Sequence, residues 1–305
     1  MHPAIPTTLL LLTFNGSLLA EFNPHAPQQD AAVSDASSLT QLICGETENK
    51  SYDSRIRAVR QLERSIPAND FSRLRDFLEK DPASEDLEPL AINAIKNDVA
   101  GKLLTSEFLP DDFSKRFLAM AESPQVGIIW QNYTIQFLDL LWKRESDPAM
   151  QQTIVQALER YTQDTRTSIA GTALLTLSRM PEGAKIAPAY LGELAIRAVR
   201  NPAIQWQDKV TALQIAARVG DSRALPQARV WAVDDQLPVI LRMSALAVLG
   251  DRGNATDRPT LERFSKSGEF RLRSAAKAAL KRLDQAAPAK AKEYTPATTL
   301  PRASR

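Results

Sequence analysis

The stretch from residue 237 to residue 284 constrains the fold most, because it repeats one helical pattern. It is predicted to form three helices, separated by clusters of turn-forming residues at 250–254 and 267–269. In its first and third helices a basic residue is followed by alanine three positions later and by leucine seven positions later: Arg242, Ala245 and Leu249, then Arg273, Ala276 and Leu280. The two arginines are 31 residues apart. A helical unit that recurs at such a period indicates a solenoid, in which each unit packs on its neighbours.

The same spacing occurs earlier in the chain, with Arg55, Ala58 and Leu62, and more weakly with Lys209, Ala212 and Ala216. This pattern resembles HEAT repeats, and it is most similar to the short type first noted in phycobilisome lyases. The resemblance implies an all-α fold, a right-handed α–α superhelix of roughly six or seven helix pairs over residues 35–284. It also implies a scaffold that binds another protein along its inner helices.

Local patterns support helices throughout this region. A helix is predicted at residues 69–80, where Phe71, Leu74 and Leu78 share one face. Three pairs of a capping residue and a proline are predicted to begin helices: Ser123-Pro124, Asp147-Pro148 and Asn201-Pro202. Alternating apolar and polar runs are absent, so we predict no strand.

The composition argues against several kinds of site. Cys44 is the only cysteine, and the two histidines, His2 and His25, precede the predicted fold. The folded region therefore cannot form a Cys/His zinc site or a His-dependent catalytic triad. No glycine-rich phosphate loop or nucleophile elbow occurs either. We expect no catalytic residue, no metal ligand and no cofactor.

Charge is unevenly distributed along the chain. Residues 190–305 contain 20 Lys and Arg against 11 Asp and Glu, whereas the rest contains 18 against 25. Within the basic part Arg273, Lys277 and Lys281 are four residues apart and form one stripe on a helix. The stripe is a candidate contact surface for an acidic protein partner. The alternative is a solvated helix face.

Two further groups have a structural and a functional interpretation. Arg242 and Arg273 occupy equivalent positions, and we favour hydrogen bonds to the preceding turn, with Asp235 or Glu269 as partner, over ligand contact. The aromatic residues Trp130, Tyr133, Phe137 and Trp142 could form a binding platform, but their helical spacing favours a place in the core.

The terminal segments are predicted to lie outside the solenoid. Residues 1–20 resemble a secretory signal peptide, although their first part contains no Lys or Arg. Residues 21–34 are a predicted linker, and residues 285–305 a predicted disordered tail. These features favour an exported protein, periplasmic or secreted, with a cytoplasmic location as the alternative. The apolar run is too short for a membrane span.

These observations together predict a non-enzymatic HEAT-repeat scaffold with a protein partner, for which the basic stripe favours an acidic surface. One alternative is a lyase-like or other enzyme on the same scaffold, which would depend on Asp, Glu, Tyr or Lys. A second alternative is nucleic-acid binding through the basic carboxyl-terminal repeats, which the acidic first half and the predicted export disfavour. The sequence leaves the oligomeric state open.

Overall fold

The computed structural model describes residues 35–48 and 51–293, except for the side chains of residues 286–293. This part of the chain contains fifteen α-helices, four short 3-10 helices and no strand. The prediction of an all-α fold is confirmed. The predicted signal peptide and the whole of the predicted linker lie outside the described residues.

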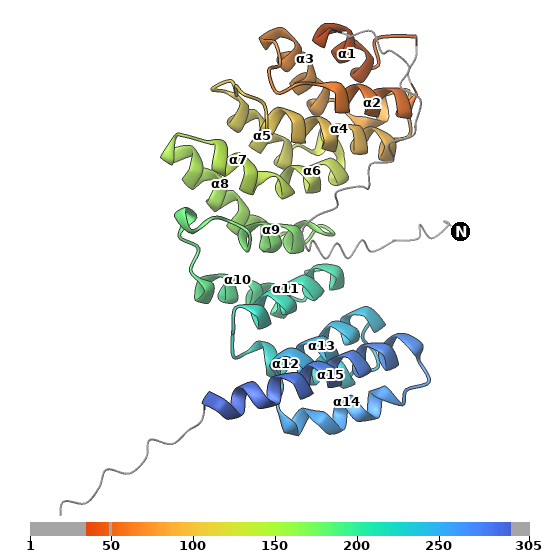
Figure 1. Ribbon diagram of the computed structural model, residues 1–305, viewed down its shortest axis with the longest axis vertical. Coiled ribbons are helices and arrows are strands. Elements are labelled where there is room, and N and C mark those ends of the chain that lie inside the picture. The colour runs from red at the N-terminus through yellow and green to blue at the C-terminus, as the bar shows by residue number, and fades with distance from the viewer. Residues whose placement is uncertain (1–34, 49–50, 294–305) are drawn as a thin grey trace, which may run out of the picture. The chain divides into compact units, whose positions relative to one another are not determined.

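Seven of the helices, here called the inner helices, form a continuous series in which each packs on the next (Figure 1). They are α2 (Tyr52–Gln61), α4 (Pro89–Leu104), α6 (Gly127–Gln136), α9 (Ile169–Leu177), α11 (Trp206–Arg218), α13 (Val239–Arg252) and α15 (Phe270–Glu293). The short helix α7 (Leu138–Arg144) follows α6 and also contacts α4 and α9.

Each inner helix also packs on a partner, here called an outer helix, that precedes it in the chain. The outer helices are α1 (Ala36–Ile43), α3 (Ala68–Glu79), α5 (Phe113–Glu122), α8 (Pro148–Tyr161), α10 (Pro188–Arg200), α12 (Ala224–Val233) and α14 (Arg258–Ser265). The 3-10 helices η1 (Pro82–Ser84), η2 (Pro124–Val126), η3 (Glu182–Ala184) and η4 (Ala255–Asp257) lie in connections. Seven helix pairs of HEAT-like type therefore form the fold, at the upper end of the predicted number.

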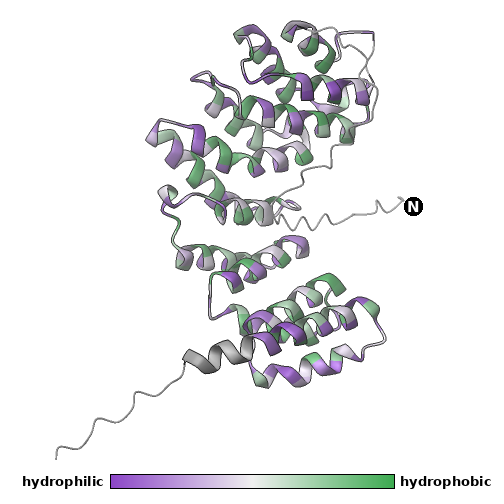
Figure 2. Ribbon diagram, viewed as in Figure 1, coloured by the Kyte–Doolittle hydropathy of each residue, from purple (hydrophilic) through white to green (hydrophobic). Residues whose placement is uncertain are grey.

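The helices carry hydrophobic residues on the sides that pack together and polar residues elsewhere (Figure 2). Small residues occupy the contacts between inner helices: Ala245 on α13 and Ala276 on α15 are fully buried. Alanine at these positions lets neighbouring helices approach closely, as the repeated spacing in the sequence predicted.

The repeated arginines hydrogen-bond to the end of the preceding helix. Arg55 Nε donates to the carbonyl oxygen of Ile43 at 2.7 Å, and Arg273 Nη1 donates to that of Ser267 at 2.6 Å. Arg242 Nε lies 3.5 Å from the carbonyl oxygen of Ala232. The structural interpretation of Arg242 and Arg273 is confirmed.

The expected acidic partners of these two arginines are wrong. Glu269 instead accepts a hydrogen bond from the backbone N–H of Leu272, at the start of α15. The carbonyl groups at a helix end are already in place as acceptors, and no side chain has to be ordered to reach them.

The aromatic group forms part of the core, as predicted. Trp130 is fully buried, and Tyr133, Phe137 and Trp142 are partly buried and pack against the core. No binding platform is made from them.

Two predicted helix boundaries differ from the structure. Asp147 caps α8 through the N–H of Ala149, as expected, but Asn201 accepts from Ala203 in a turn, and α11 begins only at Trp206. Pro124 begins a 3-10 helix, not an α-helix, and the Ser123 side chain does not cap it. An Asx or proline turn and a helix start share the same local sequence, so the sequence alone does not separate them.

The last helix is longer than predicted. α15 continues past Asp284 to Glu293, where a disordered tail was expected. This segment is rich in alanine and lysine, which have high helix propensity, and Pro288 interrupts its backbone hydrogen bonds. Residues 294–305 are outside the described part. No helix between residues 35 and 293, apart from the undescribed residues 49–50, is long and apolar enough to cross a bilayer.

Candidate functional site

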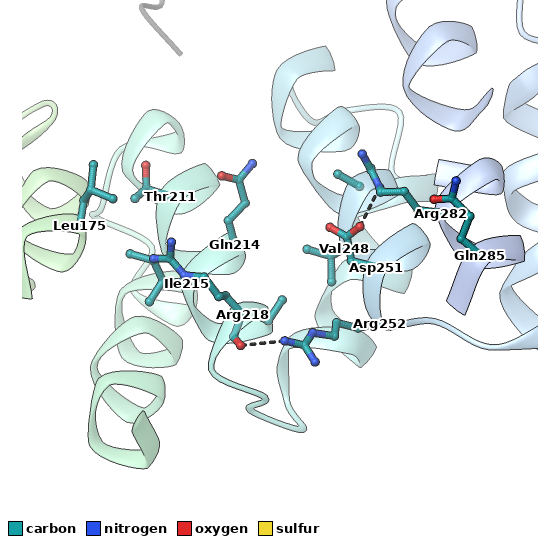
Figure 3. A pocket seen from close by; sticks show the side chains of 12 residues that line it. Leu175, Thr211, Gln214, Ile215, Arg218, Val248, Asp251, Arg252, Arg282 and Gln285 are labelled. Atoms are coloured by element: carbon teal, nitrogen blue, oxygen red, sulfur yellow. Dashed lines mark hydrogen bonds and ion pairs between the residues drawn. The ribbon is translucent and has the colours of Figure 1, made fainter. Parts of the chain in front are cut away.

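A groove with a volume of about 720 Å³ lies across the inner helices α9, α11, α13 and α15 (Figure 3). Its lining combines an apolar part with a strongly basic rim. The lining residues are Leu175, Thr211, Gln214, Ile215, Ala217, Arg218, Ala247, Val248, Asp251, Arg252, Arg282 and Gln285. The volume is in the range of pockets that hold small ligands.

The basic rim follows from the register of the inner helices. Arg218 ends α11 and Arg252 ends α13, so both arginines lie in the last turn of successive inner helices. Arg252 Nη2 donates a hydrogen bond of 2.7 Å to the carbonyl oxygen of Arg218, which brings the two last turns together (Figure 3). A cation at this position also interacts favourably with the negative end of the helix dipole.

The guanidinium groups of Arg218 and Arg252 are available to a ligand. Arg218 Nη2 donates to Ser178 Oγ at 3.0 Å, and both arginines are exposed. Within the described part of the chain, no carboxylate lies within 4.0 Å of either guanidinium. Each guanidinium has five N–H donors in a planar fork, and one donor is used in each of these contacts. The remaining donors match a carboxylate or a phosphate.

The third arginine of the groove is paired. Arg282 Nε on α15 lies 2.7 Å from Asp251 Oδ1 on α13 (Figure 3). Both side chains are about half exposed, so the attraction between them is screened by solvent. The groove thus has three arginines against one aspartate, and its net charge favours an anion.

The apolar part of the lining gives the groove a second binding property. Ile215 and Val248 belong to the core, while Leu175 is 37% exposed and faces the groove. Thr211 and Gln214 add uncharged hydrogen-bonding groups from α11. This combination suits a ligand that carries an acidic group and also has carbon atoms to bury.

The stripe predicted from the sequence does not line this groove. Arg273 is half-buried, is bonded to the turn before α15, and lies over the ring of Phe270 at 5.7 Å. Lys277 and Lys281 are exposed on α15. The stripe remains a prediction, with Arg273 tied to a structural contact.

Sequence reasoning missed Arg218, Arg252 and Arg282 as a group because they are about one repeat apart in the chain. No short motif can contain them. Alignment of the repeats by the last turn of the inner helix would have revealed Arg218 and Arg252, which end their helices, but not Arg282, which lies in the middle of α15. Among the described residues, no cluster of His, Cys, Asp and Glu is placed to hold a metal ion.

Comparison with known proteins gives one solved structure to report. No family model matches the sequence, and a sequence search of curated proteins found no match. The structure of human deoxyhypusine hydroxylase in complex with glycerol is similar to this chain, with 11% sequence identity, over 83% of this chain and 97% of that one, at a TM-score of 0.33. At that TM-score and identity the likeness transfers neither residues nor an activity.

This finding corrects two expectations from the sequence. The solved chain is that of an enzyme, a hydroxylase, so the comparison contradicts the predictions of a non-enzymatic scaffold and of a protein without enzymatic activity, and it assigns no activity to this chain. The composition argues only against catalysis that depends on histidine, and the sequence left open an enzyme that depends on Asp, Glu, Tyr or Lys. Carboxylates, lysines and tyrosines can also carry out proton transfer. The described part of the chain folds as a series of HEAT-like helix pairs.

Proposed function

We propose that the protein binds an anionic ligand in the groove between α9 and α15. The observation that carries this proposal is the pair Arg218 and Arg252, which lie next to each other in the groove. Among the described residues, no carboxylate is within ion-pair distance of either guanidinium, because Asp251 is paired with Arg282. A ligand with one or more carboxylate or phosphate groups would bind there through charge-assisted hydrogen bonds. The same contacts would hold a substrate or a partner.

Binding of citrate, a small tricarboxylate, measured by calorimetry at low ionic strength, tests this proposal. The wild-type protein is expected to bind it saturably. The variant Arg218→Gln/Arg252→Gln is expected to bind at least about tenfold more weakly, because each charge-assisted hydrogen bond contributes about 1.5–3 kcal/mol, and about 1.4 kcal/mol is a factor of ten.

A matched control separates the groove from general electrostatics. Arg200 is an exposed arginine at the end of the outer helix α10, outside the groove. Arg200→Gln removes one charge and is expected to leave citrate binding within about twofold, because Arg200 does not line the groove and acts on a ligand there only through water of high dielectric constant. Equal weakening by the control and by the groove variant would contradict the proposal, as would wild-type protein that does not bind citrate.

We also infer that the repeats are of the short HEAT-like type found in phycobilisome lyases. The shared offsets of Arg242, Ala245 and Leu249 and of Arg273, Ala276 and Leu280, together with the bond from each arginine to the preceding helix end, support this. Superposition of these two pairs, from a crystal structure of the protein, on experimental short repeats would test it. Non-equivalent arginine positions would contradict it.

A further inference from the structure

The contact between Arg252 and α11 is one of a series along the inner helices. Lys102 Nζ on α4 donates to the carbonyl oxygen of Leu62 after α2 at 2.8 Å, and Arg144 Nη2 on α7 donates to that of Ser106 after α4 at 2.7 Å. Arg179 Nη2, just after α9, donates to the carbonyl oxygen of Gln136 at the end of α6, at 3.2 Å.

The series continues into the groove. Arg218 reaches Ser178 after α9, Arg252 reaches the end of α11, and Arg282 reaches Asp251 at the end of α13. We call these six cations the basic row: Lys102, Arg144, Arg179, Arg218, Arg252 and Arg282. Every inner helix from α4 onward, taking α7 with α6, contributes one member, and each member contacts the end of the inner helix before it.

We propose that the basic row extends the anion site into a track for an acidic polypeptide segment in extended conformation. This inference rests on the proposed function of the groove and names its ligand class. The groove would hold one end of the segment at Arg218, Arg252 and Arg282, and Arg179 and Arg144 would contact the rest of it.

The spacing of the row selects a polypeptide. Packed helices lie about 8–10 Å apart, so successive members of the row recur at roughly that distance. In the extended polyproline II conformation a polypeptide advances about 3.1 Å per residue with three residues per turn, so acidic side chains at every third residue lie on one face and recur at about 9 Å. A nucleic-acid strand carries a phosphate on every nucleotide, at a closer spacing than the row, so many phosphates would have no cation opposite.

The state of the side chains is consistent with a contact surface. Arg144, Arg179, Arg218 and Arg252 are exposed, and the contacts to helix ends fix their positions before a ligand arrives. Fixing long side chains in advance reduces the entropy lost on binding. Arg179 Nε lies 3.9 Å from Asp139 Oδ2, near the upper limit for an ion pair, so the guanidinium of Arg179 retains N–H donors for a second acceptor.

The experiment uses two labelled peptides of about 15 residues, long enough at about 3.1 Å per residue to span most of the row. Both contain the same five glutamates among serines and glycines, either at every third position or in one block. Fluorescence anisotropy at low ionic strength is expected to show about tenfold tighter binding of the periodic peptide. Equal affinity for the two peptides would overturn the match in spacing.

Variants outside the groove separate this inference from the proposed function. Arg144→Gln/Arg179→Gln is expected to weaken the periodic peptide by roughly tenfold and to leave citrate binding unchanged, because neither residue lines the groove. If this variant binds the peptide as the wild type does while Arg218→Gln/Arg252→Gln weakens both ligands, the track is overturned and the groove stands. If the wild type binds neither ligand, both proposals fail.

Two further measurements test the track and the class of its ligand. Arginine modification by phenylglyoxal, mapped by mass spectrometry on the wild-type protein, should show protection of Arg144 and Arg179 by the periodic peptide but none of Arg200. This result does not depend on how well the variants fold, and absence of protection would overturn the track. A single-stranded DNA oligonucleotide of equal charge that binds more tightly than the peptide and protects the same arginines would overturn the identification of the ligand as a polypeptide.

Discussion

Gly250 on α13 lies directly against Ala279 on α15, so closely that a Cβ atom at Gly250 would be 2.6 Å from the Cα atom of Ala279. This is far shorter than any ordinary van der Waals contact, and the obstacle is backbone. The close approach fixes the position of α15 and, with it, the Arg282 side of the groove.

Gly250→Ala is therefore expected to destabilise the protein by about 1–3 kcal/mol, the usual cost of overpacking a close contact. Chemical denaturation would measure it. Gly101 on α4 is the matched control, because a Cβ there would meet nothing within 4 Å. Gly101→Ala is expected to raise the free energy of unfolding by about 0.5–1 kcal/mol, since alanine is the better helix former. The same sign of effect at both positions would contradict the steric account.

Lys96 gives the protein a defined pH dependence. Its side chain is fully buried and donates to the carbonyl oxygens of Leu78, at 3.0 Å, and Lys80. Burial lowers the pKa of Lys96 to about 8, from its ordinary value of 10.5. Between these two values the unfolded chain binds a proton that the native state lacks, so the contribution of Lys96 to the free energy of unfolding rises with pH.

The difference in unfolding free energy between wild type and Lys96→Met is expected to shift in favour of the wild type by roughly 2–3 kcal/mol between about pH 7 and about pH 10. Denaturation of both proteins at the two pH values measures this shift. Lys277→Met, at an exposed position, should show no such shift. A pH-independent difference for Lys96→Met would mean that the buried amine titrates normally.

Asp208 joins two repeats through both oxygens of one carboxylate. From α11 its Oδ1 accepts the N–H of Gly171 at 2.7 Å, and its Oδ2 accepts the N–H of Ser168 at 3.0 Å, at the start of α9. The side chain is buried, so an amide in its place would leave one backbone donor without an acceptor.

Asp208→Asn is expected to lower the free energy of unfolding by about 1–3 kcal/mol. Asp234 is the control, because its carboxylate accepts a single backbone hydrogen bond, from Gln236, that asparagine can replace. Asp234→Asn should cost no more than about 0.5 kcal/mol. Equal losses at the two positions would show that charge, and not the second acceptor, matters.

In the predicted stripe on α15, Arg273 makes a structural contact, whereas Lys277 and Lys281 are exposed. Arg273→Glu is expected to destabilise the protein by about 1–2 kcal/mol, because it removes the hydrogen bond to Ser267 and puts a negative charge beside carbonyl oxygens at a helix end. Lys277→Glu should change stability by no more than about 0.5 kcal/mol. Thermal unfolding of the two variants measures this difference. Similar melting temperatures would contradict a structural role for Arg273 that Lys277 lacks.

The architecture could be predicted from sequence because it depends on local spacing. The offsets from Arg242 to Leu249 and from Arg273 to Leu280 repeat on single helices, and a periodicity of 3.6 residues is visible in any short window. The buried aromatic group was predicted for the same reason.

The groove could not be predicted in this way because its chemistry joins different repeats. Arg218 meets Arg252 only through the stacking of α11 on α13, which local periodicity does not define. The partner of Arg273 was also missed, since a backbone carbonyl is present at every position and leaves no mark in the sequence. Partners across repeats therefore require the register of the inner helices, which only the structure supplies.

The measurement that tests the central claim most directly is an NMR titration of arginine side-chain Nε–Hε signals with citrate. The account predicts that the signals of Arg218, Arg252 and Arg282 shift along one saturable curve, while the signals of Arg197 and Arg200 on the outer helix α10 stay in place. Shifts of equal size at the outer-helix arginines, or no shift at Arg218 and Arg252, would contradict the assignment of this groove as the anion-binding site.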